Sequence, residues 1–165
     1  MIRYSGVSGG AAVSSGAFVP EISMSEVIQS RFGEIMVDVE RAVAFPNGLL
    51  GMPDKSHFIL ANFSSPKMEQ FTLLQSLDDT ALSFITLPLE INNSIISAAD
   101  IRGAADDLQI KYDDLAILLI VSVHRSPDKI RLSANARAPL FIDVKRKVGA
   151  QYVFQNDHYK VQSML

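Results

Sequence analysis

The sequence contains no cysteine, so neither a disulfide framework nor a thiolate metal site can form. It also lacks any apolar run near the roughly 20 residues that a membrane-spanning helix needs. The opening stretch, MIRYSGVSGG, has one arginine but no continuous apolar segment after it, unlike a secretory signal. These absences predict a cytoplasmic protein that neither spans a membrane nor is exported.

The chain does have enough apolar material for one core. Of its 165 residues, 48% are apolar and only 20% are charged. Single domains typically hold about 100 to 200 residues, and a domain of this length buries about two-thirds of its unfolded surface. We therefore expect one domain that folds alone, as a monomer.

The first 24 residues differ in composition from the rest. They are mostly Ser, Gly, Ala and Val without a period, a composition that does not repay its ordering entropy. In the following stretch FGEIMVDVE, Ile35 and Val37 lie two positions apart, which predicts a half-buried strand starting near Arg31. The sequence thus predicts a flexible N-terminal extension over 1–24 and a folded domain over 25–165.

Seven further runs are rich in β-branched or aromatic residues, which brings the expected strands to roughly eight. One segment differs: in SAADIRGAADDLQI, Ser97 is placed as an N-cap and Asp100 as its capping-box partner, which predicts one short helix. The gaps between strands are too short for repeated crossover helices. The expected fold class is mainly β, a small antiparallel β-barrel-like single domain with one short helix, with a sandwich as the alternative. The seven runs are HFILANF, FTLLQSL, LSFITLPL, LAILLIVSVH, IRLSANA, PLFIDV and AQYVFQ.

Two adjacent acids, Asp78 and Asp79, lie within LLQSLDDTALSF. The flanking runs are typical of strands, and DDTA has the length of a hairpin loop, where Asp is favoured because its side chain caps the turn. Neighbouring strand residues also point to opposite faces, which does not suit a shared acid/base site. We interpret the pair as a turn.

Other motifs that carry chemistry have little support. Residues 6–10 match G-x-S-x-G, but a nucleophile elbow needs a strand before it and a helix after it. The three histidines, His57, His124 and His158, lie too far apart in sequence for a preformed zinc or iron site. No phosphate-binding glycine motif is present. We expect no enzymatic activity, no cofactor and no metal.

Charge is unevenly distributed along the chain. Residues 90–114 carry six acids against two bases, whereas residues 125–147 carry seven bases against two acids. We expect two oppositely charged surfaces, and such asymmetry steers partners. The bases within DVKRKVGAQY are interpreted as a solvated hairpin tip, with RNA binding through residues 125–147 as an alternative.

Several blocks together resemble the FliW family of bacterial flagellar assembly factors. These blocks are FGEIMVDVERAVAFPNGLLGM, LLQSLDDTALSF, DDLAILLIVSVHRSPDKIRLSANARAPLFID and GAQYVFQNDHYKV, which occur in family order from about residue 27 onward. Within these blocks, the motifs most specific to the family are the hairpin LQSLDD and the two short motifs SAN and APL. Asp143 occupies a position where the family pattern has asparagine.

The resemblance implies a small, mostly antiparallel β-barrel-like domain without enzymatic activity. It also implies partner exchange: such proteins bind flagellin in the cytoplasm and, once flagellin is exported, bind and antagonise CsrA, an RNA-binding translational repressor. The alternative is a flagellin-specific cytoplasmic chaperone without a CsrA partner. Candidate contacts for CsrA are Asp100, Asp106, Asp107, Asp113 and Asp114. Structural motif residues are Gly48, Gly51, Gln75, Asp78, Asp79, Asn135 and Pro139.

Overall fold

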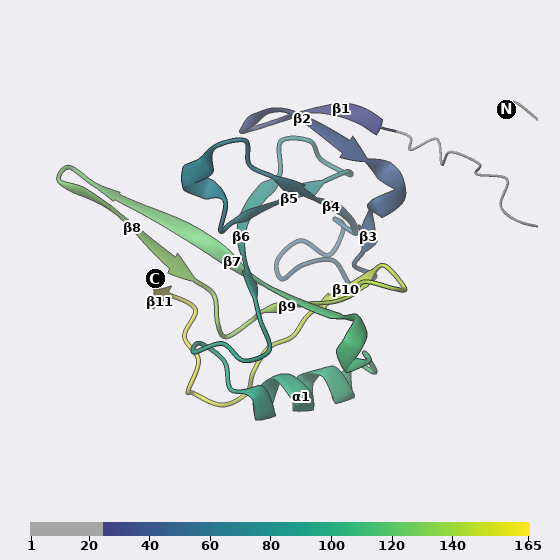
Figure 1. Cartoon of the computed structure of the whole chain (residues 1–165), viewed down its shortest axis with the longest axis vertical. Coiled ribbons are helices and arrows are strands. Elements are labelled where there is room, and N and C mark those ends of the chain that lie inside the picture. The colour runs from purple at the N-terminus through teal and green to yellow at the C-terminus, as the bar shows by residue number, and fades with distance from the viewer. Residues whose placement is uncertain (1–24) are drawn as a thin grey trace, which may run out of the picture.

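The structure, a computed structural model, describes residues 25–165 (Figure 1). Within this range it has eleven strands, one α-helix and three short 3-10 helices. The helices are η1 (Val39–Arg41), η2 (Pro66–Met68), α1 (Ala98–Asp107) and η3 (Tyr112–Asp114). The strands are β1 (Ser25–Ser30), β2 (Gly33–Asp38), β3 (Val43–Ala44), β4 (His57–Asn62), β5 (Thr72–Ser76), β6 (Ser83–Leu89), β7 (Leu115–Ser126), β8 (Lys129–Ala134), β9 (Leu140–Asp143), β10 (Val148–Gln151) and β11 (Ser163–Met164).

Nine of these strands form one sheet that closes on itself. Their order is β11-β8-β7-β6-β5-β4-β3-β10-β9, and β7 also pairs with β9. That extra pairing makes a ring of seven strands, from β7 through β6, β5, β4, β3 and β10 to β9. All pairings are antiparallel except that of β3 with β10. The expected mainly β fold with one helix is confirmed, and the pairing favours the barrel over the sandwich.

Strand β7 belongs both to the ring and to an extension outside it. Residues 115–118 pair with β9, residues 117–121 with β6 and residues 121–126 with β8. Beyond the last contact with β6, the hairpin of β7 and β8 leaves the ring and projects away from the body (Figure 1). We call residues 122–132 the arm. The short strand β11 at the C-terminal end pairs with the foot of β8.

Alternating residues of β7 face two separate cores. Leu118 packs inside the ring with Phe45, Phe58 and Leu140. Its neighbours Ile117 and Leu119 belong to a second cluster, which includes buried residues of α1. This is the period of two that a strand buried on both faces requires. The second core is what holds α1 and the following η3 against the outside of the ring.

The structure corrects the predicted strand boundaries. The first described strand is β1 at Ser25, so a first strand near Arg31 is wrong, because Arg31 lies in the turn between β1 and β2. Strands β3 and β11 have two residues each, too few to produce a pattern. The run AQYVFQ is strand only up to Gln151. Phe154 is nevertheless buried, so its apolar character reflects core packing rather than strand pairing.

Candidate functional site

The five acids of the candidate site lie on α1 and η3, on one side of the ring. Ser97 is the N-cap of α1, as expected: its Oγ accepts a hydrogen bond from the backbone N–H of Asp100 at 3.1 Å and donates one to the Asp100 carboxylate at 2.8 Å. This cap satisfies one of the backbone N–H groups that would otherwise lack a partner at the helix start. The reciprocal bond of the expected capping box is not made, because the Ser97 N–H donates to the Tyr159 hydroxyl at 3.1 Å instead of to Asp100. The cap therefore sets where the helix begins and how it presents its acids.

Asp100 is held within the fold rather than displayed on it. Its carboxylate accepts hydrogen bonds from the Tyr159 hydroxyl and from Ser97. These two donors, Tyr159 first, hold the pKa of Asp100 below its ordinary value because they stabilise the ionised form. Tyr159 is itself buried, so Asp100 links α1 to the C-terminal segment.

Asp106 and Asp107 lie at the C-terminal end of α1 and are exposed. Acids at this end oppose the helix dipole, an effect of about 0.3 to 1 kcal/mol at exposed positions. The Tyr152 hydroxyl donates a hydrogen bond to Asp107, and this interaction, more than burial, raises the pKa of Tyr152. The Asp106 side chain has no hydrogen-bond or ion-pair partner within residues 25–165. Stabilisation of the helix therefore does not explain why acids occupy these two positions.

Asp113 and Asp114 follow on η3, where the chain turns into β7. Asp113 is exposed, and its side chain makes no ion pair in the described part of the chain. Asp114 is half-buried, and its backbone carbonyl accepts a hydrogen bond from Val144 N–H at 2.9 Å. We call Asp106, Asp107, Asp113 and Asp114, which α1 and η3 bring to one side, the acidic surface.

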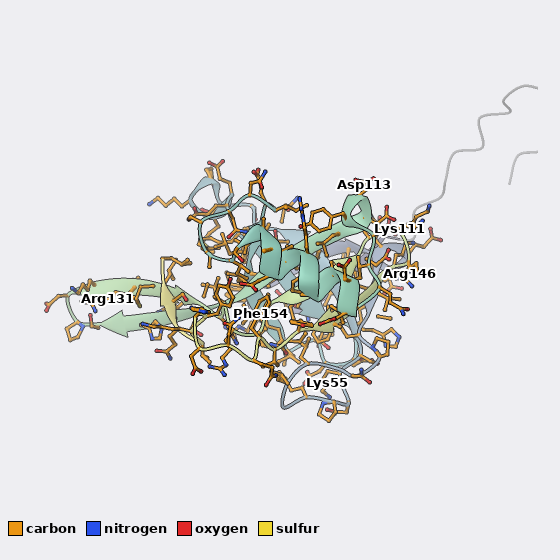
Figure 2. The ribbon with its side chains drawn as sticks, turned by 90° about the horizontal axis from the view of Figure 1, so that it is seen from below. Lys55, Lys111, Asp113, Arg131, Arg146 and Phe154 are labelled. Atoms are coloured by element: carbon orange, nitrogen blue, oxygen red, sulfur yellow. The ribbon has the colours of Figure 1, made fainter. Side chains whose placement is uncertain are left out.

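The acidic surface has a basic border, and the expected separation into two charged surfaces is wrong. The Arg146 guanidinium donates to the Gln109 carbonyl at 2.8 Å, just after the end of α1. Figure 2 shows Arg146, Lys111 and Asp113 on the same side of the molecule, with Arg131 at the opposite extreme on the arm. The basic segment is therefore divided between the β9–β10 turn and the arm. This division argues against one continuous RNA-binding surface.

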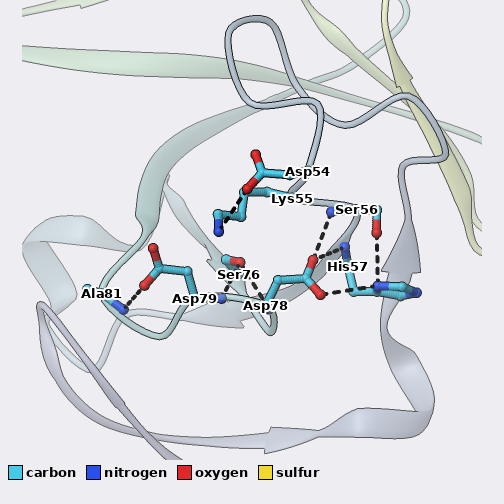
Figure 3. Close-up of polar contacts among 8 residues, drawn as sticks. All are labelled: Asp54, Lys55, Ser56, His57, Ser76, Asp78, Asp79 and Ala81. Carbon is cyan, nitrogen blue, oxygen red and sulfur yellow. Dashed lines mark hydrogen bonds and ion pairs between the residues drawn. The ribbon is translucent and has the colours of Figure 1, made fainter.

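Asp78 and Asp79 lie in the turn between β5 and β6, where they hold backbone groups (Figure 3). Asp79 accepts a hydrogen bond from Ala81 N–H at 3.0 Å. Asp78 accepts hydrogen bonds from the backbone N–H groups of Ser56 and His57 at 2.8 and 2.9 Å. The His57 N–H is the main cause of a lowered pKa at Asp78. The two acids therefore act separately, and Asp78 connects this turn to the start of β4.

Ser56, His57 and Asp78 have the residue types of a hydrolytic triad but a different geometry. The Ser56 hydroxyl lies 3.1 Å from Nδ1 of His57, and an Asp78 oxygen lies 3.5 Å from that same nitrogen (Figure 3). In a triad the serine and the carboxylate contact opposite ring nitrogens, so that the imidazole can pass a proton between them. Here both contact one nitrogen. The group stabilises a loop and has no relay geometry.

The glycines of the PNGLLGM loop take backbone conformations with positive φ. Gly48 has φ 64° and Gly51 has φ 80°, and a Cβ at Gly48 would collide with the Met52 carbonyl oxygen. The loop is joined by a bridge between Leu49 and Met52. Glycine is therefore required at residue 48 on two grounds, whereas at residue 51 only the backbone angle favours it.

Three other motif residues organise turns. Buried Gln75 donates from its amide nitrogen to the carbonyls of Ser76, Thr80 and Leu82. Asn135 accepts a hydrogen bond from Ala138 N–H at 3.0 Å in the connection between β8 and β9. Pro139 is buried at the end of that connection, immediately before β9. The side chains of Gln75 and Asn135 thus hydrogen-bond to backbone groups in connections between strands of the ring.

Two residues at the candidate site were not identified as partners of the acids from the sequence. Tyr152 was placed in the expected strand run AQYVFQ, and Tyr159 carried no interpretation, yet their hydroxyls bind Asp107 and Asp100. The available signal was the tyrosines themselves, because a buried ring with a polar tip usually finds a partner. The G-x-S-x-G match at residues 6–10 and the predicted extension over 1–24 lie outside the described residues.

Two other features are absent from the part of the chain that the structure describes. Across residues 25–165, no group of three His, Asp or Glu side chains gathers as metal ligands would. Over the same range, no helix combines the length and apolar character needed to cross a membrane. Fold and surface together define a class of protein: a small, mainly β protein whose sheet closes through the pairing of β7 with β9 and whose candidate site is a charged surface beside its helix.

Comparison with known proteins makes the assignment specific. A family model described as FliW protein matches residues 26–165. The chain is 30% identical over 142 residues to a flagellar assembly factor FliW from Oceanobacillus iheyensis, covering 85% of this chain and 93% of that one. A flagellar assembly factor FliW from Alkaliphilus metalliredigens is 30% identical over 140 residues, covering 81% and 82%. A crystal structure of the flagellar assembly factor FliW superimposes with TM-score 0.65 at 26% identity, covering 84% and 96%. The chain belongs to the FliW family.

Proposed function

We propose that this protein is a flagellar assembly factor that acts by partner exchange in the cytoplasm. It binds flagellin or, alternatively, the translational repressor CsrA, and it antagonises CsrA by binding it. Family membership supports this proposal, because the relatives from Oceanobacillus iheyensis and Alkaliphilus metalliredigens are flagellar assembly factors. The activity is binding and involves no catalysed reaction.

The observation that carries the CsrA contact is the presence of free acids on the acidic surface. Asp100 and Asp107 are hydrogen-bonded to tyrosines, whereas Asp106 and Asp113 are exposed and have no side-chain partner within residues 25–165. Carboxylates without internal partners remain available to the basic groups of an RNA-binding protein. Complementary charge mainly raises the association rate and the specificity of such a contact.

Calorimetric titration of the full chain with the cognate flagellin and, separately, with CsrA from the same cell tests the proposal. We expect binding to both, with flagellin displacing CsrA. The double variant D106K/D113K should weaken CsrA binding at least about tenfold and flatten its salt dependence, because two attractive charges become repulsive. These two positions are preferable to Asp107, whose replacement would also free Tyr152.

The matched control is the double variant E40K/E69K. Both glutamates are exposed, their side chains make no ion pair in the described part of the chain, and the reversal changes net charge equally. CsrA binding by this control should stay close to wild type. If CsrA binding weakened equally in the two double variants, the acidic surface would not be the CsrA contact. Binding of flagellin without CsrA would support the chaperone instead.

A further inference from the structure

The arm has two unlike faces. Residues paired directly across antiparallel strands project to the same side, and Val123 pairs with Leu132 while Arg125 pairs with Ile130. These four residues form one face, which is apolar except at its outer end. The opposite face is polar and consists of Ser122, His124, Ser126, Lys129 and Arg131.

The apolar face of the arm continues the core beyond the body of the protein. At its foot, Val121 and Ala134 are buried in the cluster that packs against α1. Further out, Val123 is 39% exposed and Ile130 is 66% exposed. An apolar sheet face is normally covered by a second layer. Here the covering layer ends at the foot of the arm, whereas apolar side chains continue along the arm beyond it.

A groove adjoins this face on its β8 side. It has a volume of about 610 Å³ and lies between Ile130 and Leu132 of the arm, Phe71 and Leu87 of the body, and the C-terminal residues Met164 and Leu165. Leu165 is half exposed, and its backbone N–H donates to the Leu132 carbonyl at 3.0 Å, so it forms part of the wall. The groove is thus lined mainly by apolar side chains from four separate segments.

Positive charge borders the groove. The arm carries Arg125, Lys129 and Arg131 against the single acid Asp128, and Arg131 itself lines the groove. None of these cations is ion-paired within residues 25–165. Figure 2 shows Arg131 projecting on the arm, far from the labelled groups of the acidic surface. A partner that covers the apolar face and enters the groove would meet Arg125 at the outer end of that face and Arg131 where it lines the groove, whereas Lys129 lies on the polar face.

We propose that the apolar face of the arm docks an amphipathic helix of a protein partner, with acidic residues flanking the helix's apolar stripe. The exposed part of the face, from Val123 to Arg125, extends about 7 Å along β7, a little more than one helical turn. Apolar side chains at i, i+3, i+4 and i+7 would cover it together with the adjoining groove, and flanking glutamates would meet Arg125 on the face and Arg131 where it lines the groove. This surface is separate from the acidic surface and does not rest on the proposed function.

The test uses the full chain and a fluorescent synthetic peptide of about 18 residues, or five helical turns. The peptide has leucines at the four stripe positions of each repeat and glutamates beside them, and binding is followed by anisotropy. We expect saturable binding that weakens with salt, and a loss of at least about fivefold in the Ile130→Ser variant, which removes an exposed apolar contact. Met36→Ser, at a 73% exposed residue on the separate β1–β2 hairpin, is the matched control and should bind like wild type.

Charge reversal provides a second, independent experiment. The double variant R125E/R131E should lose the glutamate peptide and bind instead a version in which lysines replace the glutamates. Three outcomes overturn the proposal: no binding of the glutamate peptide, equal binding of both peptides by wild type, or equal loss in Ile130→Ser and Met36→Ser. A dimer in sedimentation that Ile130→Ser converts to monomer also overturns it, because a second copy would then cover the arm. Neither flagellin nor CsrA is used, so failure of this proposal is distinguishable from failure of the proposed function.

Discussion

Asp143 and Arg146 join the β9–β10 turn to the end of α1. The Arg146 Nε atom donates to the Asp143 carboxylate at 2.7 Å, while the same guanidinium donates to the Gln109 carbonyl at 2.8 Å. The Asp143 side chain is 5% exposed and also accepts the backbone N–H groups of Lys145 and Arg146. One carboxylate therefore organises the turn that borders the acidic surface.

Replacement of Asp143 by asparagine should make stability less dependent on pH. The pKa of Asp143 is lowered, first by the Arg146 backbone N–H and then by its guanidinium. Because the folded pKa lies below the unfolded value of about 4, the carboxylate stabilises the fold above that value and ceases to do so as pH falls through the folded pKa. Calorimetry should show D143N melting below wild type at pH 7, with a smaller difference near pH 3. An unchanged difference would contradict this account.

Gly149→Ala should destabilise the ring. An added Cβ would lie 2.6 Å from two ring atoms of Phe45, which is fully buried and packs against Phe58. Overpacking of this kind costs about 1 to 3 kcal/mol of unfolding free energy. The control is Gly103→Ala in α1, where nothing lies within 4 Å and a gain of up to about 1 kcal/mol is expected. Urea denaturation should therefore give opposite signs for the two variants.

Gln75→Met should weaken the β5–β6 hairpin with little change in side-chain volume. Gln75 donates to three carbonyls and accepts from the Ser83 hydroxyl, and it is fully buried. Leaving buried acceptors without donors costs about 1 to 3 kcal/mol. The exposed Gln155→Met serves as control and should stay within about 0.5 kcal/mol of wild type. Equal stability of Gln75→Met and wild type in urea would show that the hydrogen bonds of Gln75 are not needed for the stability of the fold.

Ser97→Ala should lower the free energy of unfolding by about 0.5 to 2 kcal/mol, the usual cost of losing an N-cap hydroxyl. The lost contacts are the 3.1 Å hydrogen bond from Asp100 N–H to the Ser97 hydroxyl and the 2.8 Å hydrogen bond from that hydroxyl to the Asp100 carboxylate. Ser97→Thr keeps a hydroxyl and should retain most of the stability. If Ser97→Ala and Ser97→Thr unfold at the same denaturant concentration, the hydroxyl cap is not what stabilises the start of α1.

Local patterns predicted the elements that depend on neighbouring residues. The N-cap at Ser97, the turn at Asp78 and Asp79, and the strand character of β7 all arise from interactions within a few positions of the chain. The first strand was placed too late because SEVIQS carries only two adjacent apolar residues and no alternation. Its pairing with β2 and the packing of Ile28 against Ile59 make it a strand.

By itself, the sequence determined a mainly β domain with one capped helix and a resemblance to a flagellar assembly family. Ring closure was decided by the tertiary structure, because the hydrogen bonds between β7 and β9 join backbone groups that every residue carries. The tertiary structure also separated the bases of the arm from Arg146 and left Ile130 exposed although it belongs to an ordinary strand run. Periodicity shows which residues share a face, whereas only the packed fold determines whether anything covers that face.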